Sequence, residues 1–262
     1  ELHLKQLQEI IITQSNQAKY NKFRDGILQY TEGTLYYFEH TGEEAWKVLL
    51  AIHDPIIETS SESIYIVDRD RKQIVRLDHK GKIIYRYTLE GRAKVVKVGD
   101  VDDIVLIYEE SEKNEKAITL LDRNGRKSSD IKITQGDIIA MSLSVEHNSI
   151  AVGMLDTTGE SLQTHLLNYD LKGNLISSTN LEDNLIYNMF YDREGKLIVI
   201  KDNEVTALVK DKAKWSVEVD LIKTTKTIDN LAVVVYGNIE NNKQLLKKSE
   251  DIIIIQKNGK LN

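Results

Sequence analysis

The chain has 262 residues, of which 41% are apolar and 29% are charged, and this apolar fraction is too high for a disordered chain. Lysine and arginine number 35 against 41 aspartate and glutamate residues, so the net charge of −6 provides no overall positive field and nucleic acid is not an expected partner. The absence of cysteine excludes disulfides, cysteine-bound zinc, cysteine-bound iron–sulfur clusters and thiol nucleophiles.

The N-terminal segment, residues 1–19, is the first predicted element. Leu2 to Ile12 has the spacing of an amphipathic helix, but its end also reads as a strand, and both interpretations stay open. The longest apolar runs, such as Ile252–Ile255, have the length of strands and not of a membrane span. Because the chain starts at Glu1 and not at Met, a signal or membrane anchor upstream is an open alternative.

A turn pattern, Asp-x-x-Gly followed by a polar residue, recurs between β-like runs. An Asp side chain accepts hydrogen bonds from N–H groups of the same turn, and Gly takes a positive φ, so each copy predicts a hairpin. The glycine-equivalent positions 42, 81, 125, 173, 213 and 259 are 39 to 48 residues apart. The copies are Glu39–Glu43, Asp78–Lys82, Asp122–Arg126, Asp170–Asn174, Lys210–Lys214 with Ala213 in place of glycine, and Gln256–Lys260. One further match, Asp192–Lys196, falls outside this spacing and predicts an inner hairpin turn.

Continuous apolar runs precede these turns. Continuous apolarity indicates strands that are covered on both faces, as in a stack of sheets. These runs are Ser63–Val67, Ile104–Tyr108, Ile150–Met154, Leu197–Ile200 and Leu231–Tyr236. The more mixed runs Ile83–Tyr87 and Ala117–Leu121 suit outer strands.

A repeat of this length with four short strands is typical of a β-propeller blade. The sequence therefore predicts an all-β fold, a β-propeller of six or seven four-stranded antiparallel blades in one domain, residues 20–262. A sandwich or a closed barrel would be built from strands without this repeat, so the period favours the propeller. The expected units are 20–53, 54–91, 92–136, 137–183, 184–221 and 222–262. In the last unit an outermost strand is expected after Gly259, and either the residues before Tyr20 or further blades would supply it.

Two segments resemble a known family. Phe23–Tyr30 with Thr34–Trp46 resembles the opening blade of DUF5711, a family of Firmicutes propellers, and Met141–Val152 resembles its inner-strand turn. Thr41-Gly42-x-x-x-Trp46 is also similar to the blade signature of pyrroloquinoline-quinone-type and WD40-like propellers. The resemblance implies a single-pass membrane protein with an extracytoplasmic propeller, an anchor upstream of Glu1 and more than six blades.

Several residues are candidates for a chemical role by residue type alone. We expect Trp46 to pack between blades and not to bind a quinone cofactor. The group Asp100, Asp102 and Asp103 could offer oxygen ligands to calcium but lacks a calcium-loop pattern, and Asp68–Arg71 is followed by Lys72 where a donor would be needed. Both predict solvated turns. The carboxylate pairs Glu43–Glu44 and Glu109–Glu110 are sequence neighbours in a strand or turn and should point apart.

The remaining candidates also favour structural roles. No serine elbow and no phosphate-binding loop occurs in the sequence. The six histidines, His3, His40, His53, His79, His147 and His165, show no metal-binding spacing. Tyrosine is enriched, with 12 residues against 3 phenylalanines, and Tyr36, Tyr37, Tyr85, Tyr87, Tyr187 and Tyr191 either favour strands or line a surface that recognises peptide or glycan.

We therefore predict a non-enzymatic module with no catalytic, cofactor-binding or metal-binding residues. It is expected to act outside the cytoplasm, membrane-anchored at the cell surface, as a protein-interaction or cell-envelope scaffold whose partner is a protein or an envelope component. Its only expected link to a membrane is the anchor upstream of Glu1. The alternative is a carbohydrate-binding or hydrolytic propeller, in which carboxylates and a His or Tyr of different blades converge at the central channel.

Overall fold

The computed structural model describes residues 18–99, 104–159, 162–181, 184–219, 222–228, 232–238, 250–256 and 258–260. Every regular element in these residues is a β-strand, and the strands form six antiparallel sheets. The chain divides into two compact units, one with the first three sheets and one with the last three. We call the sheets blades 1 to 6 in chain order.

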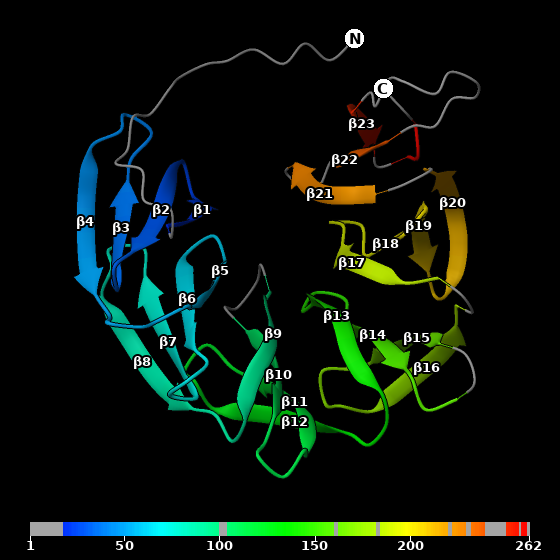
Figure 1. Ribbon diagram of the computed structural model, residues 1–262, viewed down its shortest axis with the longest axis horizontal. Helices are drawn as coiled ribbons and strands as arrows, with labels where there is room; N and C mark the ends of the chain where they lie inside the picture. Colours follow the sequence, from blue (N-terminus) through cyan, green and yellow to red (C-terminus); the bar gives the residue numbers. More distant parts are fainter. Residues whose placement is uncertain are drawn as a thin grey trace. The chain divides into compact units, whose positions relative to one another are not determined.

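In the N-terminal unit each blade has four strands that pair in chain order (Figure 1). Blade 1 contains β1 (Lys19–Phe23), β2 (Gly26–Thr31), β3 (Thr34–Phe38) and β4 (Glu44–Leu49). Blade 2 contains β5 (Ile56–Thr59), β6 (Ser63–Asp68), β7 (Gln73–Asp78) and β8 (Ile83–Thr88). Blade 3 contains β9 (Arg92–Val98), β10 (Val105–Glu110), β11 (Lys116–Leu121) and β12 (Lys127–Ile133).

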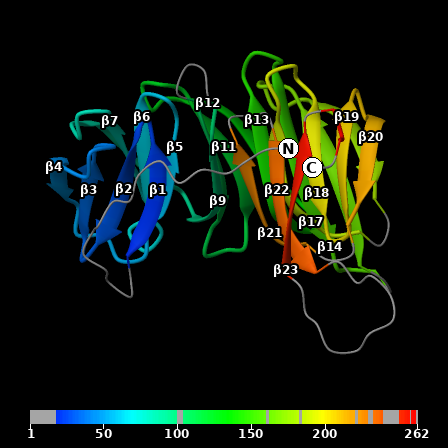
Figure 2. The ribbon, with the colours of Figure 1, turned by 90° about the horizontal axis from the view of Figure 1, so that it is seen from above.

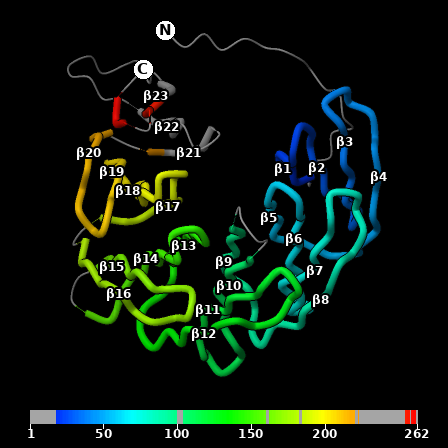
Figure 3. The backbone as a smooth tube through the Cα atoms, turned by 180° about the vertical axis from the view of Figure 1, so that it is seen from behind, coloured from blue at the N-terminus to red at the C-terminus, as the bar shows by residue number. Residues whose placement is uncertain are grey.

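The C-terminal unit repeats the same pattern, as Figure 3 shows for the neighbouring blades 4 and 5. Blade 4 contains β13 (Asp137–Ser144), β14 (Ser149–Asp156), β15 (Gln163–Tyr169) and β16 (Leu175–Asn180). Blade 5 contains β17 (Ile186–Tyr191), β18 (Leu197–Lys201), β19 (Glu204–Val209) and β20 (Lys212–Glu218). Blade 6 has three described strands, β21 (Ile222–Ile228), β22 (Ala232–Asn238) and β23 (Glu250–Gln256).

The predicted units agree with these sheets: five sheets lie inside one expected unit each, and blade 1 begins at Lys19, one residue before its expected unit. All five continuous apolar runs are second strands, namely β6, β10, β14, β18 and β22. The segment Leu2 to Ile12 lies outside the described residues, so the helix and the strand interpretation both stay open.

The hydrophobic cores lie between neighbouring sheets, and the second strands β6 and β18 each contribute to two of them. In β6, Ile64 and Ile66 pack into the core between blades 1 and 2, which face each other in Figure 2. Tyr65 and Val67 of the same strand pack into the core between blades 2 and 3. Opposite faces of one strand carry alternate residues, so a strand buried on both faces must be apolar throughout. This confirms the predicted stack.

The predicted turns connect the third and fourth strands. Asp78, Asp122 and Asp170 each accept two hydrogen bonds from N–H groups of their own turn through one carboxylate oxygen, at 2.8 to 2.9 Å. The glycine of each turn takes a φ of 76 to 88°, where a side chain would be strained. The same bonding occurs at Asp192 between β17 and β18, which confirms the predicted inner hairpin.

Two local predictions were wrong in detail. Ala117–Leu121 is not an outermost strand but lies within β11, between β10 and β12, and is largely buried. Its polar residue Thr119 misled the prediction, because the Thr119 hydroxyl donates to the buried carboxylate of Glu109 at 2.9 Å. The turn expected over 210–214 is a two-residue connection at Lys210 and Asp211, both with positive φ, and β20 begins at Lys212.

Candidate functional site

A cleft of about 670 Å³ opens between blades 1 and 2, and we call it the blade 1–2 cleft. In an antiparallel meander the first and third connections between strands lie at the same end of the sheet. The first and third turns of blades 1 and 2 therefore come together at one end of the two sheets. The cleft is lined by Arg24, Asp25, Tyr37, Glu39, Ala45, Trp46, His79 and Lys80.

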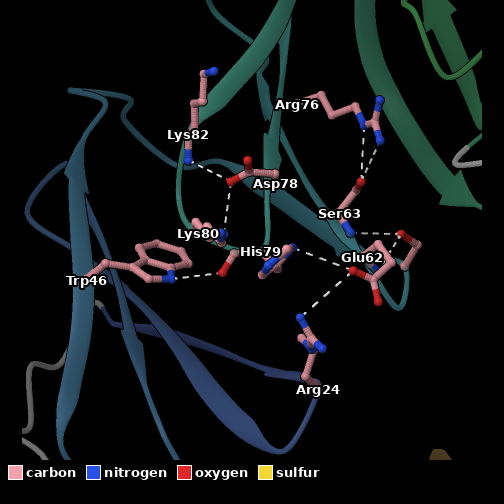
Figure 4. A network of polar contacts seen from close by, with 10 residues as sticks. Arg24, Trp46, Glu62, Ser63, Arg76, Asp78, His79, Lys80 and Lys82 are labelled. Atoms are coloured by element: carbon pink, nitrogen blue, oxygen red, sulfur yellow. Dashed lines mark hydrogen bonds and ion pairs between the residues drawn. The ribbon is translucent and has the colours of Figure 1, made fainter.

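Trp46 of β4 forms the apolar wall of the cleft. Its ring stacks on Tyr37 at a centroid distance of 5.5 Å, and it also lies against Gly81 of blade 2, where an added Cβ would be 2.8 Å from the ring. The indole Nε1 donates to the carbonyl oxygen of His79 at 3.0 Å (Figure 4). Trp46 therefore packs between blades, as predicted, and is a fixed wall of the cleft and not a mobile stacking surface.

The turn that holds Gly81 also positions the polar residues of blade 2. The Asp78 carboxylate accepts hydrogen bonds from the backbone N–H groups of Lys80 and Lys82 (Figure 4). The carbonyl of Asp78 accepts a hydrogen bond from the N–H group of Gly81. These bonds fix the backbone of the turn. His79 and Lys80 are consequently held at the rim of the cleft by the local sequence of the turn.

Asp25 lies in the two-residue turn between β1 and β2. The Tyr37 hydroxyl donates to Asp25 Oδ1 at 3.0 Å, and His40 Nδ1 lies 3.5 Å from Oδ2. The hydrogen bond from Tyr37 is the main reason why the pKa of Asp25 lies below its usual value. Burial, followed by the bond to Asp25, raises the pKa of Tyr37 to about 12. Asp25 is thus a carboxylate, and an acceptor, at neutral pH.

Glu62 joins the two blades at the edge of the cleft. Arg24 of blade 1 and His79 of blade 2 approach the same oxygen of Glu62, with Nη1 at 3.8 Å and Nδ1 at 3.5 Å (Figure 4). Arg24 takes a φ of 51°, which is uncommon for a residue other than glycine. Exposed ion pairs of this kind add little stability. The cluster therefore leaves charged groups at the edge available to a ligand.

A second depression, of about 480 Å³, lies between blades 2 and 3. Its basic groups already have acidic partners: Lys72 contacts Glu112 at 2.7 Å, and Lys94 contacts Glu110 at 3.2 Å. The blade 1–2 cleft is larger and has an aromatic wall of Tyr37 and Trp46, whereas no aromatic residue lines the second depression. The blade 1–2 cleft is therefore the better candidate site.

The structure places the other weighed acidic residues in turns or in structural contacts. Asp68, the last residue of β6, accepts hydrogen bonds from the N–H groups of Asp70 and Arg71, which confirms the predicted turn, but its side chain is buried and not solvated as expected. Glu109 is buried whereas Glu110 pairs with Lys94, so these neighbours point apart as expected. Asp100, Asp102 and Asp103 lie outside the described residues.

The tyrosines and histidines do not gather at one place. The Tyr37 hydroxyl is hydrogen-bonded to Asp25, and the Tyr191 hydroxyl is hydrogen-bonded to Ser149. Tyr187 is 55% exposed on blade 5. His40 and His79 lie in third connections, as predicted, and His147 contacts the hydroxyl of Ser144 through Nδ1 at 2.9 Å. His53 follows blade 1, His165 lies in β15, and His3 is outside the described residues.

The described residues contain no group of three histidine or carboxylate side chains placed to bind a metal ion. No helix among them has the length and apolar character of a membrane span.

Sequence reasoning did not identify Arg24, Asp25 and Glu62 as members of a site. The predicted blade boundaries contained a signal for this site. They place the first and third turns of blade 1 and the first and third turns of blade 2 at the same end of the two sheets. The sequence does not show how blades 1 and 2 pack against each other, so these charged residues could not be distinguished from charged residues in the other turns.

Comparisons with known proteins agree with the predicted architecture. A family model described as a family of unknown function, DUF5711, matches residues 3–262. No curated protein matches the sequence.

The similar solved structures are propellers of low identity. BamB from Moraxella catarrhalis is 14% identical with a TM-score of 0.52, and the match covers 82% of this chain and 68% of that one. The WD40 domain of Pan2 from Neurospora crassa is 14% identical with a TM-score of 0.55, covering 79% and 63%. The C-terminal WD40 domain of Sif2 is 12% identical with a TM-score of 0.63, covering 94% and 70%. Together with the six sheets, these matches confirm the predicted β-propeller.

Proposed function

This chain belongs to the DUF5711 family, and we propose that its β-propeller is a non-enzymatic interaction module that binds a protein segment in the blade 1–2 cleft. The observation that carries the proposal is the combination of a rigid aromatic wall with charged groups of both signs in one cleft. Tyr37 and Trp46 form the wall, while Arg24, Asp25 and Lys80 surround it. A site of this kind suits a peptide that presents an apolar side chain flanked by acidic and basic groups.

The directions of the pKa shifts of Asp25 and Tyr37 support a binding role of the cleft over a catalytic one. A general acid or base works best when its pKa lies near the working pH. The pKa of Asp25 is lowered and that of Tyr37 is raised to about 12, so both move away from neutral pH. Asp25 then acts as a fixed acceptor and Tyr37 as a fixed donor.

The hydrolytic alternative needs two cooperating carboxylates. Glu58 of β5 has a raised pKa, chiefly because of burial, which is the shift expected of a catalytic acid. Its partner is a cation, since Lys97 of β9 lies 3.6 Å away. This contact favours an ion pair between first strands, so we keep the interaction role as the proposal.

We further propose that the module acts outside the cytoplasm at the cell envelope, on the basis of the family resemblance. Protease treatment of intact cells tests this location. Cleavage of the propeller before lysis is expected, and protection until lysis would contradict it.

The interaction role is tested by photo-crosslinking in the producing cell. A photoreactive amino acid replaces Lys80, and a matched control replaces Lys172, which occupies the same third position of the Asp-x-x-Gly turn in blade 4. We expect a discrete protein adduct from position 80 and none from position 172.

A charge-reversal variant of Arg24 then shows whether the adduct at position 80 depends on recognition by the cleft or only on chance proximity. Arg24→Glu is expected to reduce the adduct at position 80 by about tenfold, because it places a negative group beside Glu62 and Asp25. Equal adducts from positions 80 and 172, or an adduct unaffected by Arg24→Glu, would contradict the proposal. The melting temperature of each variant shows that the fold is intact.

A further inference from the structure

Two unlike charges line the blade 1–2 cleft without pairing with each other. Glu39 directly follows β3 on the blade 1 side, and Lys80 lies in the third turn of blade 2. Both side chains are exposed. Within the described part of the chain, neither the Glu39 carboxylate nor the Lys80 ammonium group makes a hydrogen bond or an ion pair.

Of the two carboxylates that line the cleft, Asp25 is already engaged and Glu39 is not. The Tyr37 hydroxyl donates to one oxygen of Asp25 at 3.0 Å, and His40 Nδ1 lies 3.5 Å from the other. The backbone of Glu39 is fixed, because its N–H donates to the Glu43 carbonyl at 3.0 Å. A cationic group of a ligand can therefore approach the Glu39 carboxylate without displacing a neighbour.

The basic groups of the cleft divide in the same way. Arg24 and His79 both approach the carboxylate of Glu62, at 3.8 and 3.5 Å. Lys80 has no acidic partner among the residues that the structure describes, while its backbone N–H donates to Asp78 Oδ1 at 2.9 Å (Figure 4). The turn thus holds the base of the Lys80 side chain and leaves its ammonium group to a ligand.

Unlike charges that are held apart produce an electric field across the cleft, from Lys80 on blade 2 to Glu39 on blade 1. A ligand that carries one positive and one negative group gains attraction at both positions when it lies along this field. A ligand with two like charges is attracted at one position and repelled at the other. The cleft therefore favours a dipolar ligand over one of high net charge.

We propose that Glu39 and Lys80 select a dipolar segment of the partner protein, with a basic and an acidic residue on either side of the apolar side chain that meets Trp46. The basic residue lies toward blade 1 and the acidic residue toward blade 2. This inference rests on the proposed function of the cleft and adds which two groups recognise the charge of the partner.

The test measures the binding of the full chain to four fluorescent peptides by anisotropy. The peptides have blocked termini and the sequences Lys-Ser-Leu-Ser-Glu, Lys-Ser-Leu-Ser-Lys, Glu-Ser-Leu-Ser-Glu and Gln-Ser-Leu-Ser-Gln. Alternate residues of an extended chain share one face, so the leucine and both end residues can enter the cleft together. The parent chain should bind the Lys/Glu peptide about fivefold more tightly than each of the other three.

Charge reversal should change this preference in a defined order. Lys80→Glu should favour the peptide with two lysines, and Glu39→Lys should favour the peptide with two glutamates. The double variant should again favour the Lys/Glu peptide, bound in the reverse orientation. The matched control is Lys172→Glu, which makes the same change of net charge in the third turn of blade 4 and should keep the parent order. All three side chains are exposed, so the melting temperatures should match that of the parent chain.

The peptide experiment and the photo-crosslinking experiment fail in different ways. The adduct at position 80 forms without the lysine side chain and reports on the cleft itself, whereas the order of the peptides reports on the two charges. An order that is the same in all variants, or that Lys172→Glu shifts as much as Lys80→Glu does, would overturn this inference alone. Failure of all four peptides to bind would overturn it as well, while loss of the adduct contradicts the proposed function.

Discussion

Single residues at blade boundaries explain why the turn glycines matter beyond their own turns. A methyl group on Gly81 would lie 2.8 Å from the Trp46 ring, and one on Gly259 would lie 2.9 Å from Trp215. Each glycine thus meets two demands, a positive φ and space for a tryptophan of the preceding blade. The recurring glycine of the sequence is therefore an inter-blade contact as well as a turn signal.

The two demands on Gly81 can be measured separately. Gly81→Ala should lower the free energy of unfolding by about 2 to 4 kcal/mol, through strain at φ 78° and overlap with Trp46. In a Trp46→Leu background only the strain should remain, about 1 to 2 kcal/mol. Denaturant unfolding of the four chains completes the double-mutant cycle. An equal cost in both backgrounds would show that the contact with Trp46 has no energetic role.

At the scale of elements, the sequence predicted the buried second strands well and the third strands less well. Continuous apolarity identified β6, β10, β14, β18 and β22, and consecutive residues of β6, β10, β14 and β18 are buried, as in strands that are covered on both faces. In β11 the pattern is interrupted by Thr119, whose partner Glu109 lies on β10. Cross-strand polar pairs are invisible to periodicity, since the register that joins them is not encoded in either run alone.

The buried carboxylate of Glu109 provides an element-scale prediction. It accepts hydrogen bonds from the Gly91 N–H at 2.6 Å and from the Thr119 hydroxyl at 2.9 Å, and Gly91 directly precedes β9. Glu109→Ala leaves the Gly91 N–H without its acceptor and the Thr119 hydroxyl with the longer contact to Asp130 Oδ1 at 3.4 Å, and it should cost about 2 to 4 kcal/mol of unfolding free energy. Glu109→Gln keeps one acceptor oxygen and should cost less.

Chemical denaturation of both variants measures this difference. The double variant Glu109→Ala with Thr119→Val removes one donor together with its acceptor and should recover part of the loss. Equal losses for the alanine and glutamine variants would mean that packing volume, not hydrogen bonding, determines the role of Glu109.

For the whole molecule, the period of about 40 residues predicted six sheets to within a few residues at each boundary, because each blade repeats one local pattern. The candidate site was not predictable in the same way. Arg24 and Glu62 come from different blades and meet only because two sheets pack face to face. A repeat predicts what each unit is, but a site between units depends on their contact.

The shared second strands predict how the N-terminal unit unfolds. β6 contributes Ile64 and Ile66 to one core and Tyr65 and Val67 to the next, so loss of order in β6 damages both. Leu35→Ala, in the core between blades 1 and 2, should cost about 2 to 5 kcal/mol. Native-state hydrogen exchange should then show the amides of β10 in blade 3 losing protection by an amount similar to those of β2 in blade 1. Unchanged protection in β10 would show that each boundary opens independently and that the shared strand does not couple the two cores.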